Sequence, residues 1–111
     1  KCPRCCSQAS SRKLGIVIDL IRGKTIEKAM TVLKFTNRSA VPMVRSVLKS
    51  AAAAATARGA KNVDSFVVAE IYAGQGPTKQ GRRVHARAQG RGAVIRKRSA
   101  HLTAVISDGK D

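Results

Sequence analysis

Residues 79–98 place the strongest constraint on what this chain can fold into. The segment holds eight basic residues and no acidic one, namely Lys79, Arg82, Arg83, Arg87, Arg91, Arg96, Lys97 and Arg98. Burying an unpaired charge is costly, because the charge loses its hydration and gains no partner. The core of a 111-residue chain is too small to absorb such a segment. We therefore expect it to project from the folded domain.

Residues 14–59 show the periodicity of three amphipathic helices. Apolar residues of the first two recur at i, i+3, i+4 and i+7, as Leu14, Val17, Ile18 and Ile21 and as Ile26, Ala29, Met30 and Leu33. Gly23 is expected to end the first helix and Thr25 to cap the second. A third helix should begin near Ser39, with Pro42 in its first turn, and end at Gly59. Its expected buried stripe is Val41, Val44, Leu48, Ala51, Ala52 and Ala55.

After residue 63 the apolar residues follow the period of two that is typical of strands. Residues 66–73 and 94–106 form two such stretches, and glycines separate them. The simplest topology joins the stretches as one antiparallel hairpin at about 67–106, with its tip at about 79–90. The predicted fold class is α+β, with three helices packed on a small antiparallel sheet and a long protruding basic β-hairpin. Residues 1–11 are expected to be an extended arm before a single domain at 12–111.

Net charge indicates the kind of partner. The chain has 22 Lys and Arg against 6 Asp and Glu, a formal charge of +16. Nucleic acid is the commonest polyanion to relieve such self-repulsion, and arginine suits it because its planar fork pairs with phosphate oxygens. About 14 residues per side at ~3.3 Å each would make a hairpin of roughly 45 Å. The hairpin lacks the aromatic residues that stack on single strands, so a folded RNA and a DNA duplex both stay open.

Two other classes of protein are alternatives for a chain with this charge. Architectural DNA-binding proteins of the histone-like type also carry basic β-arms, usually with an apolar wedge such as proline at the arm tip. Residues 79–98 contain no proline. A membrane-active domain would need a helix with a basic face opposite a bulky apolar one, whereas the cations here gather on a strand pair. No apolar run is long enough to span a bilayer, and no signal peptide of the usual pattern is expected.

Catalytic and metal-binding motifs are not evident in the sequence. Cys2, Cys5 and Cys6 cluster near the N-terminus, a distribution that favours a reducing compartment over a disulfide scaffold. They could form half of a zinc site, but a structural site needs four ligands and only His85 and His101 remain. The acidic residues are scattered, and Glu70 is expected to pair with an arginine across the hairpin. We expect neither an enzyme nor a bound metal or cofactor.

Seven short motifs together resemble one known family, the large-subunit ribosomal protein twenty-two family in its bacterial or organellar form. They occur in the order of that family and cover residues 10–107. They are SSRK at 10–13, DLIRGK at 19–24, SAAAAA at 50–55, GPT at 76–78, RAQGR at 87–91, IRKR at 95–98 and HLT at 101–103.

The resemblance implies an α+β domain on large-subunit ribosomal RNA, near the exit of the polypeptide tunnel. Further implied partners are neighbouring large-subunit proteins and the nascent polypeptide, with neither a membrane nor a second copy of the chain. The implied location is the ribosome, in the bacterial cytoplasm or in an organellar matrix or stroma. The tunnel-lining tip would be Gln80, Gly81, Arg82, Arg83, Val84, His85 and Ala86. The RNA-binding residues would be Arg12, Lys13, Arg22, Lys24, Lys79, Arg82, Arg83, Arg87, Arg91, Arg96, Lys97, Arg98 and His101.

Overall fold

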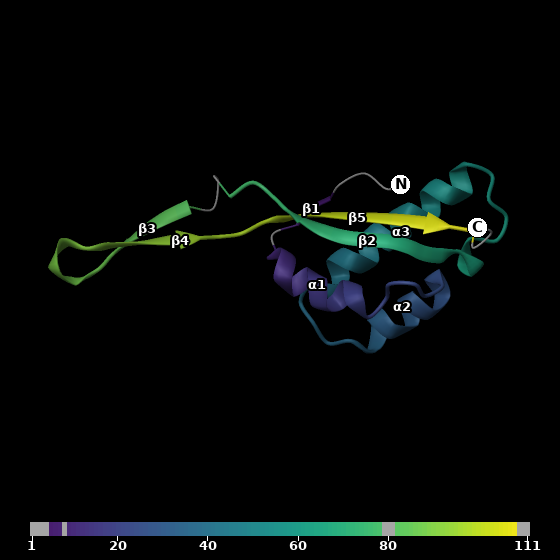
Figure 1. Ribbon diagram of the computed structural model, residues 1–111, viewed down its shortest axis with the longest axis horizontal. Coiled ribbons are helices and arrows are strands. Elements are labelled where there is room, and N and C mark those ends of the chain that lie inside the picture. The colour runs from purple at the N-terminus through teal and green to yellow at the C-terminus, as the bar shows by residue number, and fades with distance from the viewer. Residues whose placement is uncertain (1–4, 8, 79–81, 109–111) are drawn as a thin grey trace.

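The computed structural model describes residues 5–7, 9–78 and 82–108 (Figure 1). Its helices and strands are β1 (Cys5–Ser7), α1 (Ser11–Asp19), α2 (Ile26–Phe35), α3 (Val41–Ala57), β2 (Val67–Gln75), β3 (Arg82–Ala86), β4 (Gly92–Arg96) and β5 (Ala100–Ser107). Two short 3-10 helices lie at Val63–Ser65 and Ala88–Gly90. One antiparallel sheet has the order β1-β5-β2, and a second consists of β3 and β4. The predicted α+β fold class is confirmed.

The core lies between the three helices and one face of the three-stranded sheet (Figure 1). Side chains of β5 that alternate along the strand, among them Leu102 and Ala104, meet the helices from the sheet. The apolar positions predicted for α1 are all at most 1% exposed. In α3 the buried stripe also contains Val47, which the sequence analysis missed, while Ala52 and Ala55 are only half-buried.

The connection between α1 and α2 is bound to β2 through its backbone. Gly23 has a φ of +73°, a conformation that glycine adopts without steric cost, and its N–H donates to the Val68 carbonyl at 3.1 Å. The Val68 N–H in turn donates to the Lys24 carbonyl at 3.0 Å. Helix α1 itself ends at Asp19, before the predicted glycine, and a turn carries the chain to this contact. Thr25 is the N-cap residue of α2, as predicted.

Part of the N-terminal arm, predicted to be extended, is a strand of the sheet. Residues 5–7 form β1, which pairs with β5 in the register Cys5↔Leu102, Cys6↔His101 and Ser7↔Ala100. The physical reason is that β5 has a second edge, whose N–H and C=O groups β1 pairs. A strand of three residues is too short to show a periodicity, so no pattern in the sequence indicates it.

The second predicted strand, residues 94–106, is divided in two. Strands β2 and β5 pair from Val67↔Ser107 to Gln75↔Ala100, with a bulge between Val68 and Glu70. Beyond this last pair both strands leave the three-stranded sheet, and the chain forms a second pair of strands, β3 with β4. The hairpin therefore extends away from the helical layer (Figure 1). The molecule measures 64 × 27 × 20 Å with a radius of gyration of 17.2 Å, above the ~13 Å of a compact 100-residue domain.

Candidate nucleic-acid interface

Strands β3 and β4 and the turn between them form a unit that we name the finger (residues 82–96). Its register is Arg82↔Arg96, Arg83↔Ile95, Val84↔Val94, His85↔Ala93 and Ala86↔Gly92. Since side chains alternate between faces, Arg96 shares one face with Val84 and Val94, and Arg83 shares the other with His85 and Ile95. Cationic positions thus occur on both faces. A finger of this kind suits an anionic partner that surrounds it better than one with a flat surface.

The turn of the finger lies at residues 87–91. The Arg87 N–H donates to the Arg91 carbonyl at 2.7 Å, and the Arg91 N–H donates to the Ala88 carbonyl at 3.3 Å. Gln89 and Gly90 have φ values of +58° and +69°, so the chain reverses through two consecutive left-handed residues. Arg87 and Arg91 therefore flank the turn, one on either side of it.

This reversal lies within the tip predicted at about 79–90, but after the residues that the resemblance gave as tunnel-lining. The resemblance gave Gln80–Ala86 as the tip, but residues 82–86 form strand β3 and lead up to the turn. The left-handed conformation needed for reversal occurs only later, at Gln89 and Gly90, among the described residues of the hairpin. Lys79, Gln80 and Gly81 lie outside the described residues, and the structure places Arg83, Val84 and His85 on a strand.

The finger buries almost nothing. Residues 83–92 and 94–98 are exposed, including the three aliphatic side chains Val84, Val94 and Ile95, at 75%, 44% and 46%. Residues 71–107 contain no acid at all. Glu70 was expected to pair with an arginine across the hairpin, and that prediction is wrong: within the described part of the chain it forms no ion pair and lies opposite Val105. The positive charge of the finger is therefore not neutralised from within.

The base of the finger is closed by a close approach between Gly76 and Ser99. The Gly76 N–H donates to the Ser99 carbonyl at 2.9 Å, and the Ser99 hydroxyl donates to the Pro77 carbonyl at 2.6 Å. A Cβ on Gly76 would come within 2.7 Å of the Ser99 Oγ. Only glycine allows this contact, which joins the two connectors where the finger leaves the sheet.

The cations predicted on the helical side are exposed, but their surroundings differ. Arg12 and Lys13 lie in the first turn of α1, which begins at the end of the domain nearest the finger (Figure 1). Arg22 forms an ion pair with Asp19 at 3.3 Å and donates from Nη2 to the Ile71 carbonyl at 3.3 Å. It therefore also holds the end of α1 against β2. The backbone of Lys24 is paired with β2, which leaves its side chain available to a partner.

His101 is the predicted site residue with the most unusual surroundings. It is half-buried, between Cys6 of β1 and Gly74 of β2 in the register of the sheet. Its Nδ1 atom is buried and has no hydrogen-bond partner among the residues that the structure describes.

Residues 5–7, 9–78 and 82–108 contain no group of three His, Cys, Asp or Glu side chains placed to hold a metal ion. No helix within the same ranges is long and apolar enough to cross a membrane.

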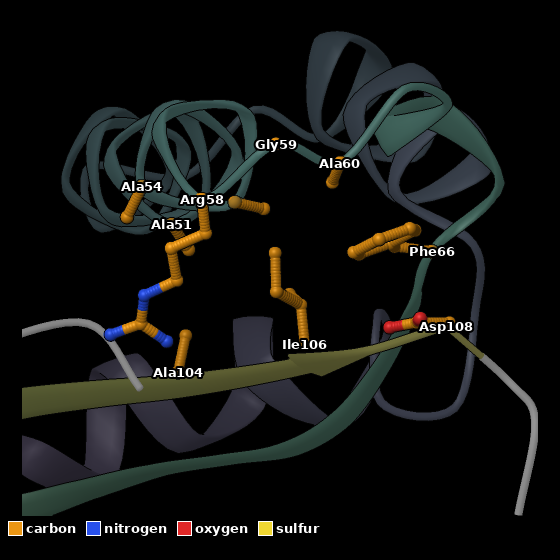
Figure 2. A pocket seen from close by; sticks show the side chains of 10 residues that line it. Ala51, Ala54, Arg58, Gly59, Ala60, Phe66, Ala104, Ile106 and Asp108 are labelled. Carbon is orange, nitrogen blue, oxygen red and sulfur yellow. The ribbon is translucent and has the colours of Figure 1, made fainter.

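Two surface features were missed by the sequence analysis. Phe35, at the end of α2, is 85% exposed and lies between the exposed cations Lys34 and Arg38. The second feature is a cavity of about 360 Å³ between the C-terminal half of α3 and the end of β5 (Figure 2). Phe35 falls outside the apolar spacing of α2, which was a usable signal. The cavity depends on how far α3 lies from β5, which no local pattern reveals.

Comparison with known proteins identifies the family. The family model described as ribosomal protein L22p/L17e matches residues 7–107. The large ribosomal subunit proteins uL22 of Staphylococcus aureus strains JH9 and Newman are each 47% identical to this chain over 100 residues. Those matches cover 90% of this chain and 84% of each relative. With most of its length matched, and with a basic hairpin projecting from an α+β domain, the chain belongs to the ribosomal protein L22p/L17e family.

Proposed function

We propose that this protein is a structural constituent of the large ribosomal subunit that binds large-subunit ribosomal RNA. The observation that carries the proposal is the finger, a cationic and acid-free two-stranded unit with almost every side chain in solvent, in a chain of the L22p/L17e family. An isolated two-stranded hairpin is at best marginally stable in water, so this one needs a partner to order it. Folded RNA supplies phosphates on both of its faces.

The proposed RNA contacts have two parts. In the finger, Arg83, Arg87, Arg91 and Arg96 would pair with phosphates, with Lys97 and Arg98 following at its base. At the helical side, Arg12 and Lys13 would continue the same positive surface, because α1 begins beside the finger base (Figure 1). Lys79, Arg82, Arg22, Lys24 and His101 complete the proposed set. Neighbouring ribosomal proteins would cover part of the remaining surface.

We further propose that the end of the finger lines the polypeptide exit tunnel and meets the nascent chain. The support is the family relationship together with the shape of the molecule, which is 64 Å long and has the finger at one end of that length (Figure 1). The turn at residues 87–91 would reach farthest, with Val84, His85 and Ala86 on the strand behind it. A photo-crosslinker at Gln89 should then label a nascent chain stalled on the ribosome, whereas one at Lys49 on α3 should not. Equal labelling from both positions would count against this placement.

The proposed function is tested by the preference of the purified protein between two nucleic acids. Binding to deproteinised large-subunit ribosomal RNA and to a DNA duplex is measured across a salt series. Both affinities should fall with salt, by a slope of roughly −0.7 to −0.9 in log K per neutralised phosphate, so the preference is what decides. Tight, saturable binding to the ribosomal RNA over the duplex is expected. Equal affinity, or bending of the duplex, would favour an architectural DNA-binding protein.

A further inference from the structure

We propose that the cavity between α3 and β5 binds an unstacked guanine base of the RNA on which the protein sits. This inference rests on the proposed function, because it names a specific contact within that RNA. The cavity lies on the helical domain and not on the finger (Figures 1 and 2). It would thus read a base, whereas the finger cations meet phosphates.

The end of α3 builds the cavity. Gly59 has a φ of +88°, its N–H donates to the Thr56 carbonyl at 2.9 Å, and the Ala60 N–H donates to the Ala55 carbonyl at 3.2 Å. These two bonds form the glycine-dependent turn that commonly ends helices. They fix Ala55 and Ala60 at the cavity wall. The α3 residues that line the cavity are the small residues Ala51, Ala54 and Ala55, and the side chain of Arg58, just beyond the helix, extends toward β5 (Figure 2).

The apolar part of the cavity lining suits the face of a flat ring. Its volume of about 360 Å³ falls at the lower end of the range of small-molecule sites, which run from ~300 to ~1,000 Å³. The buried residues Ala51 of α3 and Ala104 of β5 line it from the helix and from the sheet, and the half-buried ring of Phe66 lies at one side (Figure 2). Proteins commonly hold unstacked bases against aromatic rings in this way. Phe66 itself is held in place, since its carbonyl accepts from the Ile26 N–H at 2.9 Å.

The charged groups of the cavity are arranged for one base in particular. The Arg58 guanidinium and the Asp108 carboxylate lie on opposite sides of Ile106 (Figure 2). Within the described residues neither forms an ion pair, so both can meet a ligand. Guanine offers acceptors O6 and N7, the usual targets of arginine, and its N1–H and N2–H₂ groups are donors that a carboxylate accepts. Adenine would turn the acceptor N1 towards a carboxylate, which is repulsive.

The test is chemical probing of guanines in the complex with large-subunit ribosomal RNA. Kethoxal modifies N1 and N2 of guanines that are free at that edge, which is the edge assigned to Asp108. The full chain is compared with Asp108→Asn, which removes the charge, and with Ala55→Phe, which fills the cavity. Asp64→Asn is the matched control, because it removes an exposed acid that does not line the cavity. Circular dichroism checks the fold of each variant, and Asp108→Asn carries the test if Ala55→Phe does not fold.

We expect at least one guanine that wild-type protein protects to become reactive with Asp108→Asn and with Ala55→Phe, and to stay protected with Asp64→Asn. The affinity for the RNA should fall about ten-fold with Asp108→Asn, the low end of what one well-made base contact contributes. Identical kethoxal patterns for wild type and both cavity variants would overturn the proposal, as would an adenine becoming exposed in place of a guanine. Identical patterns would also be the outcome if a neighbouring protein, and not a base, fills the cavity. The proposed function fails separately, if wild-type protein does not bind the RNA at all.

Discussion

The hydroxyl of Ser99 donates a 2.6 Å hydrogen bond to the carbonyl oxygen of Pro77, across the two connectors that lead from the sheet into the finger. The two residues are 22 positions apart in the chain. Together with the hydrogen bond from the Gly76 N–H to the Ser99 carbonyl, this contact fixes both connectors at one point. The direction in which the finger leaves the domain therefore depends on a short clamp and not on a continuous sheet.

Replacing Ser99 by alanine should loosen that clamp. The lost hydrogen bond is exposed, so the free energy of unfolding should fall by no more than about 0.5–1 kcal/mol. The more sensitive readout is amide hydrogen exchange at Gly76, which should become faster. Ser99→Thr keeps a hydroxyl and should leave the exchange rate close to that of wild type. The clamp would be disproved if the alanine and threonine variants exchanged at the same rate.

Replacing Gly76 by alanine should be more damaging, because the new Cβ would approach Ser99 Oγ to 2.7 Å and the Ser99 carbonyl carbon to 3.0 Å. The backbone has to shift, and we expect a loss of about 1–3 kcal/mol in the free energy of unfolding by urea titration. Gly15→Ala is the matched control. It lies inside α1 with no atom within 4 Å of the added Cβ, so it should stabilise the protein by about 0.5–1 kcal/mol. Equal effects of the two substitutions would contradict this account of Gly76.

The core under α1 gives a prediction about stability. Leu14 is 0% exposed, and Leu14→Ala should lower the free energy of unfolding by about 2–5 kcal/mol, because it leaves a cavity in packed surroundings. Leu20, just beyond the end of the same helix, is 43% exposed, so Leu20→Ala should cost less than half as much. The loss of stability in each variant is measured by thermal unfolding, which circular dichroism monitors. A larger loss for Leu20→Ala would mean that the core is packed differently.

The finger arginines should matter for RNA binding and not for folding. Combined replacement of Arg87, Arg91, Arg96 and Arg98 by alanine should leave the helical circular-dichroism spectrum unchanged, since all four are exposed. Binding to large-subunit ribosomal RNA should weaken, and the slope of log K against log salt should become shallower by roughly 0.7–0.9 per lost phosphate contact.

The control for this variant makes the same change in net charge on the helical side of the molecule. It replaces the exposed residues Lys28, Lys34, Lys49 and Lys61 by alanine. Its effect on RNA affinity should be clearly smaller than that of the arginine variant. If both variants weakened binding equally, net charge rather than the finger would explain the affinity.

Much of the helical layer could be predicted from sequence, because an amphipathic helix repeats its buried positions every three or four residues. Leu14, Val17 and Leu33 were found in this way and are buried. Val47 was missed although it stands three residues after Val44 and four before Ala51, spacing that fits the same face. The helical period alone therefore predicts that Val47 is buried.

The features that sequence reasoning missed depend on contacts far apart in the chain. Strand β1 is specified by its pairing with β5, as in Cys6↔His101, and not by its own three residues. The reversal of the finger depends on Gln89, a residue that seldom adopts a positive φ. In the sequence around this reversal, only the neighbouring Gly90 indicates a turn. The cavity beside Phe66 likewise results from the packing of α3 on β5.

The measurement that tests the central claim most directly is hydrogen–deuterium exchange of the finger amides, with and without large-subunit ribosomal RNA. In the free protein the ladder of β3 and β4 is exposed on both faces, so we predict rapid exchange at Val84, Val94 and their neighbours. In the complex these amides should exchange many times more slowly, because RNA encloses the finger. Protection confined to the helical domain, with the finger exchanging as fast as before, would contradict the account.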